Sequence, residues 1–194
     1  MEQRSPEWFA ARKGRITGSS VGSILGLSPF GKRDDVMRRM VRDYMGLPTE
    51  FTGNVATEWG TLNEPGALKE YEMITGNTVE PATFVMYEDW LGASPDGLID
   101  QDGLVEIKCP FGLRQKDDPK FKTIEEQPHY YTQIQIQLLV TGRKWCDFFQ
   151  WTPKNMAIQT VNYSDSYTQT VLRGLRVFWE EYLHEREHNQ EKYK

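Results

Sequence analysis

Two acids and a lysine in the middle of the chain have the residue types and spacing of a metal-dependent hydrolytic site. Asp96 follows Pro95, and Glu106 and Lys108 lie two positions apart in the next apolar run. Side chains alternate between the two faces of a β-strand, so Glu106 and Lys108 share one face. A half-buried acid and base are costly there unless something neutralises or uses them. A divalent cation would do both, and the pattern predicts a metal site built by Asp96 and Glu106.

These residues are expected on a β-hairpin. Two apolar runs are separated by the turn-forming segment 100–103, which ends in Asp-Gly, a strong hairpin signal. If Ile99 pairs with Leu104, then Gly97 lies opposite Glu106. Asp96 then falls one position away, within reach of a cation that Glu106 also binds.

A regular strand in this register would point Asp96 to the wrong face. The prediction therefore requires Pro95 and Gly97 to bend the strand, and both residue types commonly mark such breaks. The alternative is a surface hairpin on which Glu106 and Lys108 form an exposed pair, worth at most ~1 kcal/mol.

The composition favours one intracellular domain. A chain of 194 residues can bury a core without disulfide support, so we predict a single domain over 1–194. Cys109 and Cys146 make neither a disulfide framework nor a zinc site, which fits a reducing compartment. No apolar run has membrane-spanning length and no signal-like start is present, so we expect a cytoplasmic protein without a membrane partner.

The formal charge of −5 by itself argues against a nucleic-acid partner, because surfaces that bind phosphates are normally basic. The distribution of the charge along the chain removes this objection. Residues 1–48 hold nine Lys/Arg and five Asp/Glu, whereas residues 49–111 hold two and twelve. This separation suits an acidic metal centre flanked by basic segments that contact phosphates.

Periodicity and turn residues predict a mixture of helices and strands. Basic N-terminal helices are expected within 5–46, a catalytic core over 55–163 and an amphipathic C-terminal helix over 165–187. Ser5 and Pro6 begin the first helix, and 16–21 is predicted as a loop that enters a short helix. Pro65 should kink the helix over 55–75 or begin a new turn. Further predictions are a helix over 33–45, strands over 78–87, 145–151 and 156–163, a surface loop with a short helix over 112–127 and a helix over 128–140.

Two strings around the acids narrow the prediction. Pro-Asp followed by Glu-x-Lys resembles the PD-(D/E)xK nuclease superfamily. The fuller strings Ser-Pro-Asp-Gly-Leu (94–98) and Glu-Ile-Lys-Cys-Pro-Phe (106–111) are similar to those of the phage lambda exonuclease and YqaJ-like viral recombinase family.

Three more segments carry the same resemblance. Residues 8–19 match the family segment Trp-x-x-x-Arg-x-Gly-x-Ile-Thr-x-Ser, which binds the 5′-phosphate end of DNA. Residues 59–64 resemble a family helix that supplies one further acid, here Glu64. Residues 130–135 resemble the helix after the active-site strand, with Gln133 in the active-site position.

The resemblance implies an α/β fold, with a mixed central β-sheet of about five strands flanked by helices around a restriction-endonuclease-like nuclease core. It implies a 5′→3′ exonuclease that degrades one strand of linear double-stranded DNA to mononucleotides. The enzyme would depend on one or two Mg²⁺ ions, which Mn²⁺ could replace. It would act in phage-type homologous recombination by single-strand annealing. Implied partners are double-stranded DNA ends, a single-strand annealing protein and further copies of the chain in a ring-shaped homotrimer. The expected setting is the cytoplasm of a bacterial host, with the gene carried by a phage or prophage.

The resemblance also assigns roles to residues. The metal ligands would be Asp96, Glu106, Glu64 and the backbone carbonyl of Ile107, with Lys108 and Gln133 completing the catalytic set. The 5′-phosphate would be held by Arg12, Ser19 and Ser94. Six basic residues are candidates for the DNA path, although a solvated surface accounts equally well for each one: Arg38, Arg39, Arg42, Lys116, Lys120 and Lys122.

Three other functions stay open. A PD-(D/E)xK endonuclease or junction resolvase would share the metal centre, and a non-catalytic DNA-end-binding module would have lost part of it. The string His-Glu-x-x-His at 184–188 matches zinc metallopeptidases, which need a third ligand. Only a charged tail follows His188, so a solvated helix end is the simpler interpretation.

Overall fold

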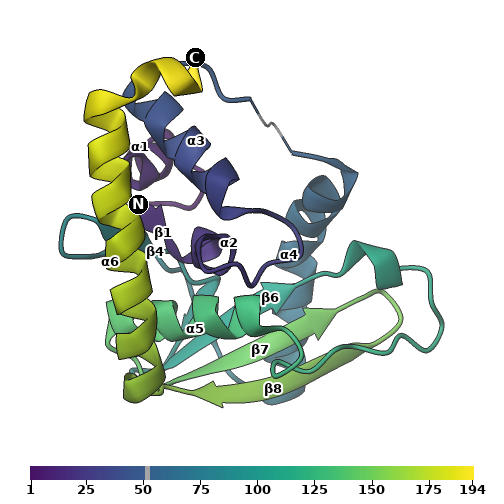
Figure 1. Cartoon of the computed structure of the whole chain (residues 1–194). Helices are drawn as coiled ribbons and strands as arrows, with labels where there is room; N and C mark the ends of the chain where they lie inside the picture. Colours follow the sequence, from purple (N-terminus) through teal and green to yellow (C-terminus); the bar gives the residue numbers. More distant parts are fainter. Residues whose placement is uncertain (51–52) are drawn as a thin grey trace.

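The computed structural model describes residues 1–50 and 53–194 and has the predicted mixed α/β architecture (Figure 1). Its helices are α1 (Pro6–Arg12), α2 (Val21–Ile24), α3 (Arg33–Tyr44), α4 (Val55–Thr75), α5 (Pro128–Thr141) and α6 (Asp165–His188). Its strands are β1 (Ile16–Thr17), β2 (Val79–Glu80), β3 (Val85–Tyr87), β4 (Leu91–Ala93), β5 (Gly97–Ile99), β6 (Gly103–Lys108), β7 (Trp145–Trp151) and β8 (Met156–Asn162). Short 3₁₀ turns are η1 (Gly18–Ser20), η2 (Phe111–Leu113) and η3 (Gln190–Tyr193).

A five-stranded mixed sheet in the order β2-β5-β6-β7-β8 forms the centre of the fold, as predicted. β6 and β7 are parallel, whereas the other neighbouring strands are antiparallel. Parallel neighbours cannot be joined by a tight turn, and α5 lies within the connection between β6 and β7. This helix therefore crosses the sheet beside the strand that carries Glu106.

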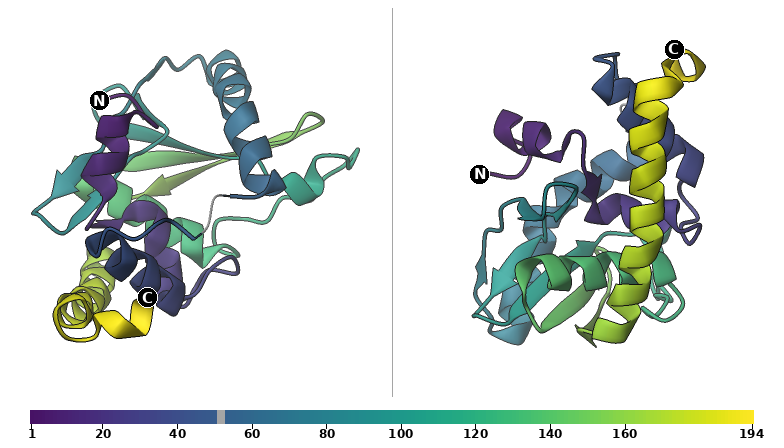
Figure 2. Two further views of the ribbon diagram at one scale, coloured as in Figure 1. Left: turned by 90° about the horizontal axis from the view of Figure 1, so that it is seen from above. Right: turned by 60° about the vertical axis from the view of Figure 1, so that its left-hand side comes forward.

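Helices α4 and α5 cover opposite faces of this sheet (Figure 2). Tyr71 of α4 packs in one cluster with Val105, and Leu138 of α5 packs in another with Leu104. Because side chains alternate along β6, Glu106 shares the α5 face with Leu104. The strand thus turns Val105 and Ile107 to α4, and Leu104, Glu106 and Lys108 to α5.

A second, three-stranded sheet in the order β1-β4-β3 joins the N-terminal region to the core. Ile16 and Thr17 pair in parallel with Leu91 and Gly92, so the prediction of a loop over 16–21 is wrong for its first two residues. The error arose because two residues of strand carry no alternation that a sequence can display. The partner strand, distant in sequence, is what makes them a strand.

The predicted strand over 78–87 is two strands in different sheets. β2 pairs with β5 in the central sheet and β3 pairs with β4 in the second. Pro81 follows β2 directly and has no N–H to continue a ladder. The apolar run from Trp90 to Ile99 is divided in the same way, because Pro95 interrupts it between β4 and β5, whereas Gly97 lies inside β5.

The remaining helices lie within one or two residues of their predicted bounds. Ser5 caps α1 and Ser164 caps α6, each through its side-chain oxygen. α4 continues through Pro65 as one helix, so no new turn begins there. α6 runs beside α3 and α5 (Figure 1), and its stripe of Val171, Leu175, Phe178 and Tyr182 is buried.

No described helix combines the length and the apolar character that crossing a membrane requires.

Candidate active site

The hairpin β5-β6 brings Asp96 to Glu106 in a register that differs from the predicted one. Ile99 pairs with Gly103 and Gly97 with Val105, so the expected pairing of Ile99 with Leu104 is wrong by one residue. Asp96 lies just before β5, at a bend between Pro95 and Gly97, and is not part of the ladder. The predicted bend is therefore present, and from it Asp96 approaches Glu106 closely enough to raise the pKa of Glu106.

The turn explains the error. It holds three residues, 100–102, and begins at Asp100, which has a positive φ of 48°. Gly103 lies in β6 under the ring of Trp145, where a Cβ would come within 2.3 Å of a ring carbon. The glycine of the Asp-Gly pair is required by packing against β7 and not by the turn.

Asp96 is fixed by the strand it faces. Its Oδ2 accepts a hydrogen bond of 2.7 Å from the backbone N–H of Ile107. Ile107 therefore contributes to the site through its main chain, while its side chain packs on the α4 face. Its carbonyl remains the predicted ligand.

Glu106 is 3% exposed and accepts hydrogen bonds from three side chains. Gln137 Nε2 donates to Oε2 at 3.0 Å, and Gln133 Nε2 donates to Oε1 at 3.4 Å. Lys108 Nζ lies 3.1 Å from Oε1. The two glutamines reach the same carboxylate because residues four apart share one face of a helix.

Lys108 is held between this carboxylate and an aromatic ring. Its Nζ lies 3.4 Å from Gln133 Oε1 and 4.6 Å from the centre of the Tyr130 ring. Burial alone would lower the pKa of Lys108, but Glu106, Tyr130 and Asp96 together raise it above its usual value. The lysine is therefore a cation at neutral pH.

The two acids repel one another in a site of low polarity. Burial and the charge of Glu64 raise the pKa of Asp96 to about 7. Burial and the charge of Asp96 raise the pKa of Glu106 to about 7. Glu64 thus reaches the site from α4, on the opposite face of the sheet from α5.

A hard divalent cation fits this donor set. All the candidate ligands are oxygens, which Mg²⁺ and Ca²⁺ prefer. Burial and mutual repulsion raise the pKa values of Asp96 and Glu106 even with Lys108 beside them, and a bound cation would favour their charged forms. Within residues 1–50 and 53–194, no group of three His, Cys, Asp or Glu side chains is already gathered closely enough to hold a metal ion. The carboxylates therefore meet in pairs, Glu64 with Asp96 and Asp96 with Glu106.

The predicted phosphate-binding residues lie next to Asp96. Trp8 Nε1 donates to Ser94 Oγ at 2.7 Å, which seats α1 on the segment 94–96. Arg12 stacks over Trp8, with 4.1 Å between its Cζ and the ring centre, and its Nη2 donates to Ser19 Oγ at 3.4 Å. One chain of contacts therefore runs from Ser94 through Trp8 and Arg12 to Ser19.

Arg12 is crowded by other cations. Burial, together with the charges of Arg39 and Arg4, lowers the pKa of Arg12 to about 10. Arg38 is paired with Glu50 through two 2.7 Å hydrogen bonds, and Arg42 donates to the Tyr193 carbonyl at 2.7 Å. Of the three arginines named as candidates for the DNA path, Arg38, Arg39 and Arg42, only Arg39 makes no hydrogen bond or ion pair to a described residue.

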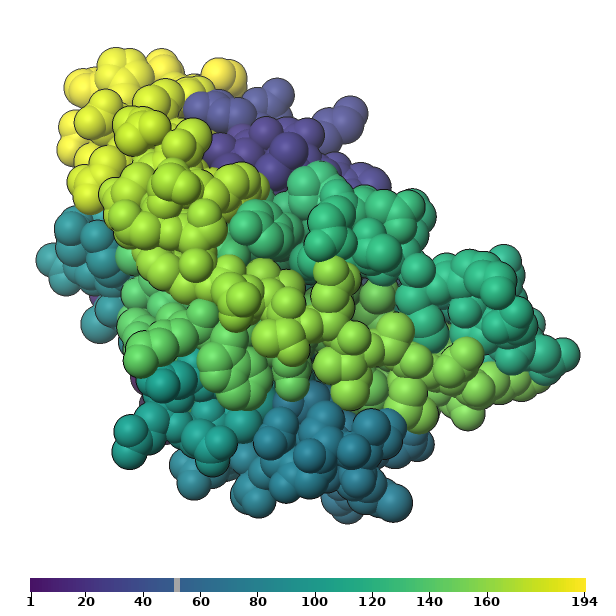
Figure 3. All heavy atoms as spheres, turned by 90° about the horizontal axis from the view of Figure 1, so that it is seen from below, coloured from purple at the N-terminus to yellow at the C-terminus, as the bar shows by residue number. Residues whose placement is uncertain are grey.

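The three candidate lysines lie on a projecting segment. Residues 112–127 extend from one end of the molecule beside the β7-β8 turn (Figures 1 and 3). Lys116, Lys120 and Lys122 are all exposed there, and Lys120 pairs with Asp118. The short helix expected in this segment is present only as η2 at its start.

The geometry around the His-Glu-x-x-His string does not favour a zinc site. His184 and His188 are exposed and their ring centres lie 4.8 Å apart. Glu185 is buried and bonds instead to Asn189, Lys192 and Tyr193. The hydrogen bonds of Glu185 therefore hold η3 in place. The described residues offer no third metal ligand beside the two histidines.

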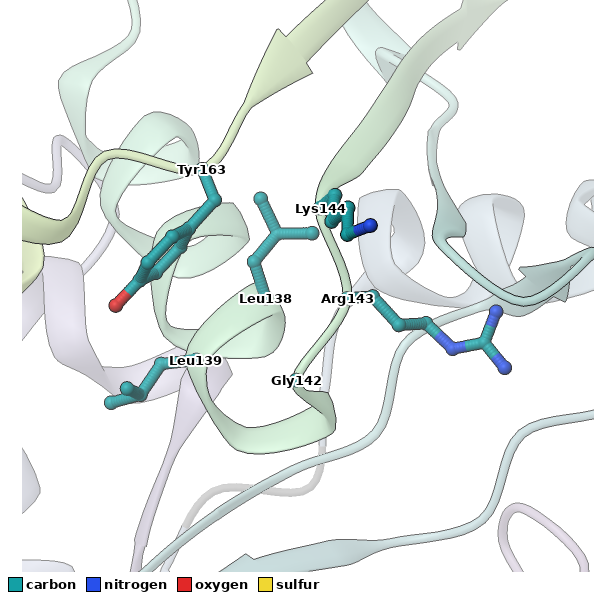
Figure 4. A pocket seen from close by; sticks show the side chains of 6 residues that line it. All are labelled: Leu138, Leu139, Gly142, Arg143, Lys144 and Tyr163. Atoms are coloured by element: carbon teal, nitrogen blue, oxygen red, sulfur yellow. The ribbon is translucent and has the colours of Figure 1, made fainter.

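One pocket lies away from the acids. A shallow hollow of about 420 Å³ is lined by Leu138, Leu139, Gly142, Arg143, Lys144 and Tyr163 (Figure 4). Arg143 lies at its edge and donates to the carbonyls of Ile99, Asp100 and Gly103, where it braces the hairpin turn. Its role is structural, at the opposite end of β6 from Lys108.

Two residues of the site were missed from sequence. Gln137 binds Glu106 as Gln133 does, and its spacing of four residues from Gln133 could have indicated this. Trp8 was treated only as part of a motif, whereas its indole N–H links α1 to Ser94. No local signal could predict a contact between residues so far apart in the chain.

A family model and several known proteins match the chain. The model described as the YqaJ-like viral recombinase domain matches residues 7–144. Two similar solved structures are of an alkaline exonuclease from Laribacter hongkongensis, one of them in complex with dAMP. Each is 29% identical, with a TM-score of 0.79 and 97% of both chains covered.

Two more distant relatives extend the comparison. A phage-related exonuclease from Haemophilus somnus shares the fold, with 17% identity and a TM-score of 0.67 over 87% of this chain and 93% of that one. An uncharacterised protein of Acanthamoeba polyphaga mimivirus is 27% identical in an alignment 165 positions long that covers 77% of this chain. The chain spans only 29% of the length of that viral protein.

Proposed function

Because this chain belongs to the YqaJ-like viral recombinase family, a family of nucleases, we propose that it is a Mg²⁺-dependent 5′→3′ exonuclease. It would degrade one strand of linear double-stranded DNA to mononucleotides from 5′-phosphorylated ends, in phage-type recombination by single-strand annealing. The observation that carries the proposal is the meeting of three side chains at the end of β6: Asp96 Oδ2 accepts from the Ile107 N–H at 2.7 Å, and Lys108 Nζ lies 3.1 Å from the Glu106 carboxylate.

The acids would hold the cation. Asp96, Glu106 and Glu64, with the Ile107 carbonyl, are the ligands we propose for one or two Mg²⁺ ions, and Mn²⁺ should substitute. When bound, the metal supplies positive charge that stabilises the negative charge of the phosphate in the transition state.

Lys108 supplies a second positive charge from the protein itself. Its ammonium group stays protonated beside Glu106 and Tyr130, so it can donate a hydrogen bond to a phosphate oxygen or orient the attacking water. Gln133 contacts both Lys108 and Glu106 and can orient the same water through its amide. Neither role requires the lysine to lose its proton before substrate binds.

Arg12, Ser19 and Ser94 would bind the 5′-phosphate. An arginine offers paired planar donors that suit a terminal phosphate, which carries more charge than an internal diester. The contact chain from Ser94 through Trp8 to Arg12 begins two residues from Asp96, so an end bound there would lie beside the acids. This arrangement favours an exonuclease over a PD-(D/E)xK endonuclease or junction resolvase, which needs no end-phosphate pocket.

The cellular setting follows from the family alone. We propose action inside a bacterial host together with a single-strand annealing protein, and assembly into a ring-shaped homotrimer around the DNA. The mass of the particle in solution, measured by sedimentation, tests the trimer directly.

A nuclease assay tests the central proposal. Linear and circular duplex DNA are incubated with the protein in Mg²⁺ or in chelator, with Asp96→Asn as the inactive control. We expect mononucleotides from linear DNA only, and only with Mg²⁺ and the intact acid. Nicked or linearised circles would support the endonuclease instead, and an unchanged substrate in Mg²⁺ would leave only a DNA-end-binding module.

A further inference from the structure

Gln137 places an amide against Glu106 in the interior of the protein. The side chain is 1% exposed, and its Nε2 donates to Glu106 Oε2 at 3.0 Å. Its own Oε1 is buried and has no hydrogen-bond partner among the described residues. An unpaired buried carbonyl costs about 1–3 kcal/mol, so the contact of the amide nitrogen with Glu106 is obtained at the expense of stability.

The two oxygens of Glu106 are therefore held differently. Oε2 is bound by a glutamine that solvent does not reach. Oε1 is bound by Lys108, whose side chain is 25% exposed, and by the longer 3.4 Å contact from Gln133. One partner of Oε1, Lys108, is thus partly open to solvent, whereas the partner of Oε2 is enclosed.

Gln137 is also fixed on its other side. A Cβ at Gly18 would lie 3.8 Å from Gln137 Cγ and 3.2 Å from Ala93 Cβ. η1 and β4 both pack against α5, and Gly18 of η1 lies beside the stem of Gln137. A side chain packed in this way cannot swing its amide away from Glu106 without moving η1.

Mg²⁺ and Ca²⁺ use carboxylates differently. Ca²⁺ takes six to eight oxygens in flexible geometry and often binds both oxygens of one carboxylate. Mg²⁺ is smaller and requires nearly octahedral geometry, which the two oxygens of one carboxylate fit poorly. A carboxylate with one oxygen already engaged therefore suits Mg²⁺.

We propose that Gln137 is a metal-selectivity residue, which engages Glu106 Oε2 and so restricts Glu106 to one-oxygen coordination through Oε1, favouring Mg²⁺ over Ca²⁺. This inference rests on the metal site of the proposed function. It adds a residue that determines which divalent cation the site prefers. Gln137 acts through Glu106 and is a positioning residue.

Cation binding to the DNA-free protein tests the inference without an activity measurement. Gln137→Met keeps the length of the side chain and removes the donor. Dissociation constants for Mg²⁺ and Ca²⁺ are measured by titration calorimetry on the full chain. We expect the affinity for Ca²⁺ relative to Mg²⁺ to rise about tenfold, which corresponds to about 1.4 kcal/mol.

Gln135→Met is the matched control. Gln135 is buried on the same helix but bonds to the Asn162 carbonyl at 2.8 Å and the Ser164 N–H at 2.8 Å, away from the acids. Its replacement should lower thermal stability and leave the ratio of the two affinities unchanged. Gln137→Asn, which retains an amide but withdraws it by one methylene, should change the ratio in the same direction as Gln137→Met and serves if that variant does not fold.

The possible outcomes distinguish failure of the selectivity role of Gln137 from failure of the metal site itself. An unchanged affinity ratio in both Gln137 variants, with cation binding that Glu106→Gln abolishes, overturns the selectivity role and leaves the proposed nuclease intact. An equal change of the ratio in Gln135→Met also overturns it, because the effect would then be general loosening of α5. Wild-type protein that binds neither cation overturns the metal site and the selectivity role with it.

Discussion

Glu106 and Glu185 are both buried glutamates, 3% and 6% exposed, yet they lie in opposite electrostatic environments. Burial and the neighbouring Asp96 raise the pKa of Glu106 to about 7. Hydrogen bonds from Asn189, Lys192 and Tyr193 lower the pKa of Glu185 to about 2. Burial is the largest cause of the raised pKa of Glu106, whereas hydrogen bonds are the largest causes of the lowered pKa of Glu185.

The difference shows which of the two motifs can bind a cation. Glu106 and Glu185 each accept from three side chains, but the donors of Glu185 lower its pKa to about 2 and so already stabilise its charge. Glu106 faces another acid, and an added cation would relieve that repulsion. The candidate site accordingly lies on the hairpin and not at the His-Glu-x-x-His helix end.

The largest expected effect is that of Glu106→Gln on turnover. Loss of a metal ligand should reduce DNA degradation by about 10³-fold or more, since metal-centred charge stabilisation supplies several kcal/mol. Glu185→Gln in the same assay should degrade DNA at the wild-type rate. Equal losses in the two variants would abolish the distinction between the two glutamates.

The same variant should be at least as stable as wild type when chelator is present. A carboxyl whose pKa is raised by folding, here from 4.5 to about 7, destabilises the folded chain as the pH rises through that range. The amide of Glu106→Gln carries no charge, so this loss disappears. Melting temperatures at pH 5 and pH 8 measure it, and a variant that melts well below wild type at pH 8 would contradict the raised pKa.

Arg12 is the cationic counterpart of Glu106, because it also lies near groups of its own charge, Arg39 and Arg4. Arg12→Ala therefore tests whether such a residue binds an ion of opposite charge. A charge-assisted hydrogen bond is worth about 1.5–3 kcal/mol, so digestion from 5′-phosphorylated ends should slow about 10- to 100-fold. Digestion from 5′-hydroxyl ends should change much less. Arg38→Ala is the control, since Arg38 is paired with Glu50 and should not distinguish the two ends. A phosphate preference that survives in Arg12→Ala would remove Arg12 from the site.

Glu185→Gln should lower stability by a few degrees in melting temperature, as expected for about 1 kcal/mol in a chain of this size. The sign follows from the lowered pKa: the stability that Glu185 contributes is present above pH 4.5 and is lost as the pH falls towards about 2. Urea unfolding at pH 7 and pH 4 should therefore show a smaller gap between variant and wild type at the lower pH. A gap that widens on acidification would show that Glu185 is not stabilised by its three donors.

The smallest expected effect is that of replacing His184 and His188 together by Ala. Both imidazoles are exposed on α6, so nuclease activity should not change and purified wild-type protein should contain no stoichiometric zinc. Elemental analysis of the two proteins is the measurement. If wild type contains zinc and the double variant does not, the end of α6 is a metal site and the prediction is wrong.

The sequence predicted the family, the central sheet and most helices because these depend on motifs and on long periodic segments. The YqaJ-like match over residues 7–144 and the five-stranded mixed sheet confirm those predictions. The predicted register of the hairpin was wrong because Gly103 is required by packing under the ring of Trp145, which lies much later in the chain. β1 was missed because only its pairing with β4 makes it a strand.

The candidate site was predictable to the extent that its residues lie in motifs. Asp96, Glu106 and Lys108 share one hairpin, so their meeting follows from local pairing. Gln137 was overlooked because the alternation of glutamines along 133–137 does not show which of them face the sheet. Helical geometry settles it, since Gln133 and Gln137 face Glu106 while Gln135 faces Asn162 and Ser164.

The crossover between β6 and β7 has a consequence for the order in which the protein is made. Residues 103–108 pair with residues 145–150, and both glutamines that hold Glu106 lie between these segments in the chain. Contacts so distant in sequence form late, because the loop must close before they are gained. A chain still emerging from the ribosome at Lys108 carries the acids without α5 to orient them or β7 to hold their strand. The chain can therefore assemble its site only once most of it has been synthesised.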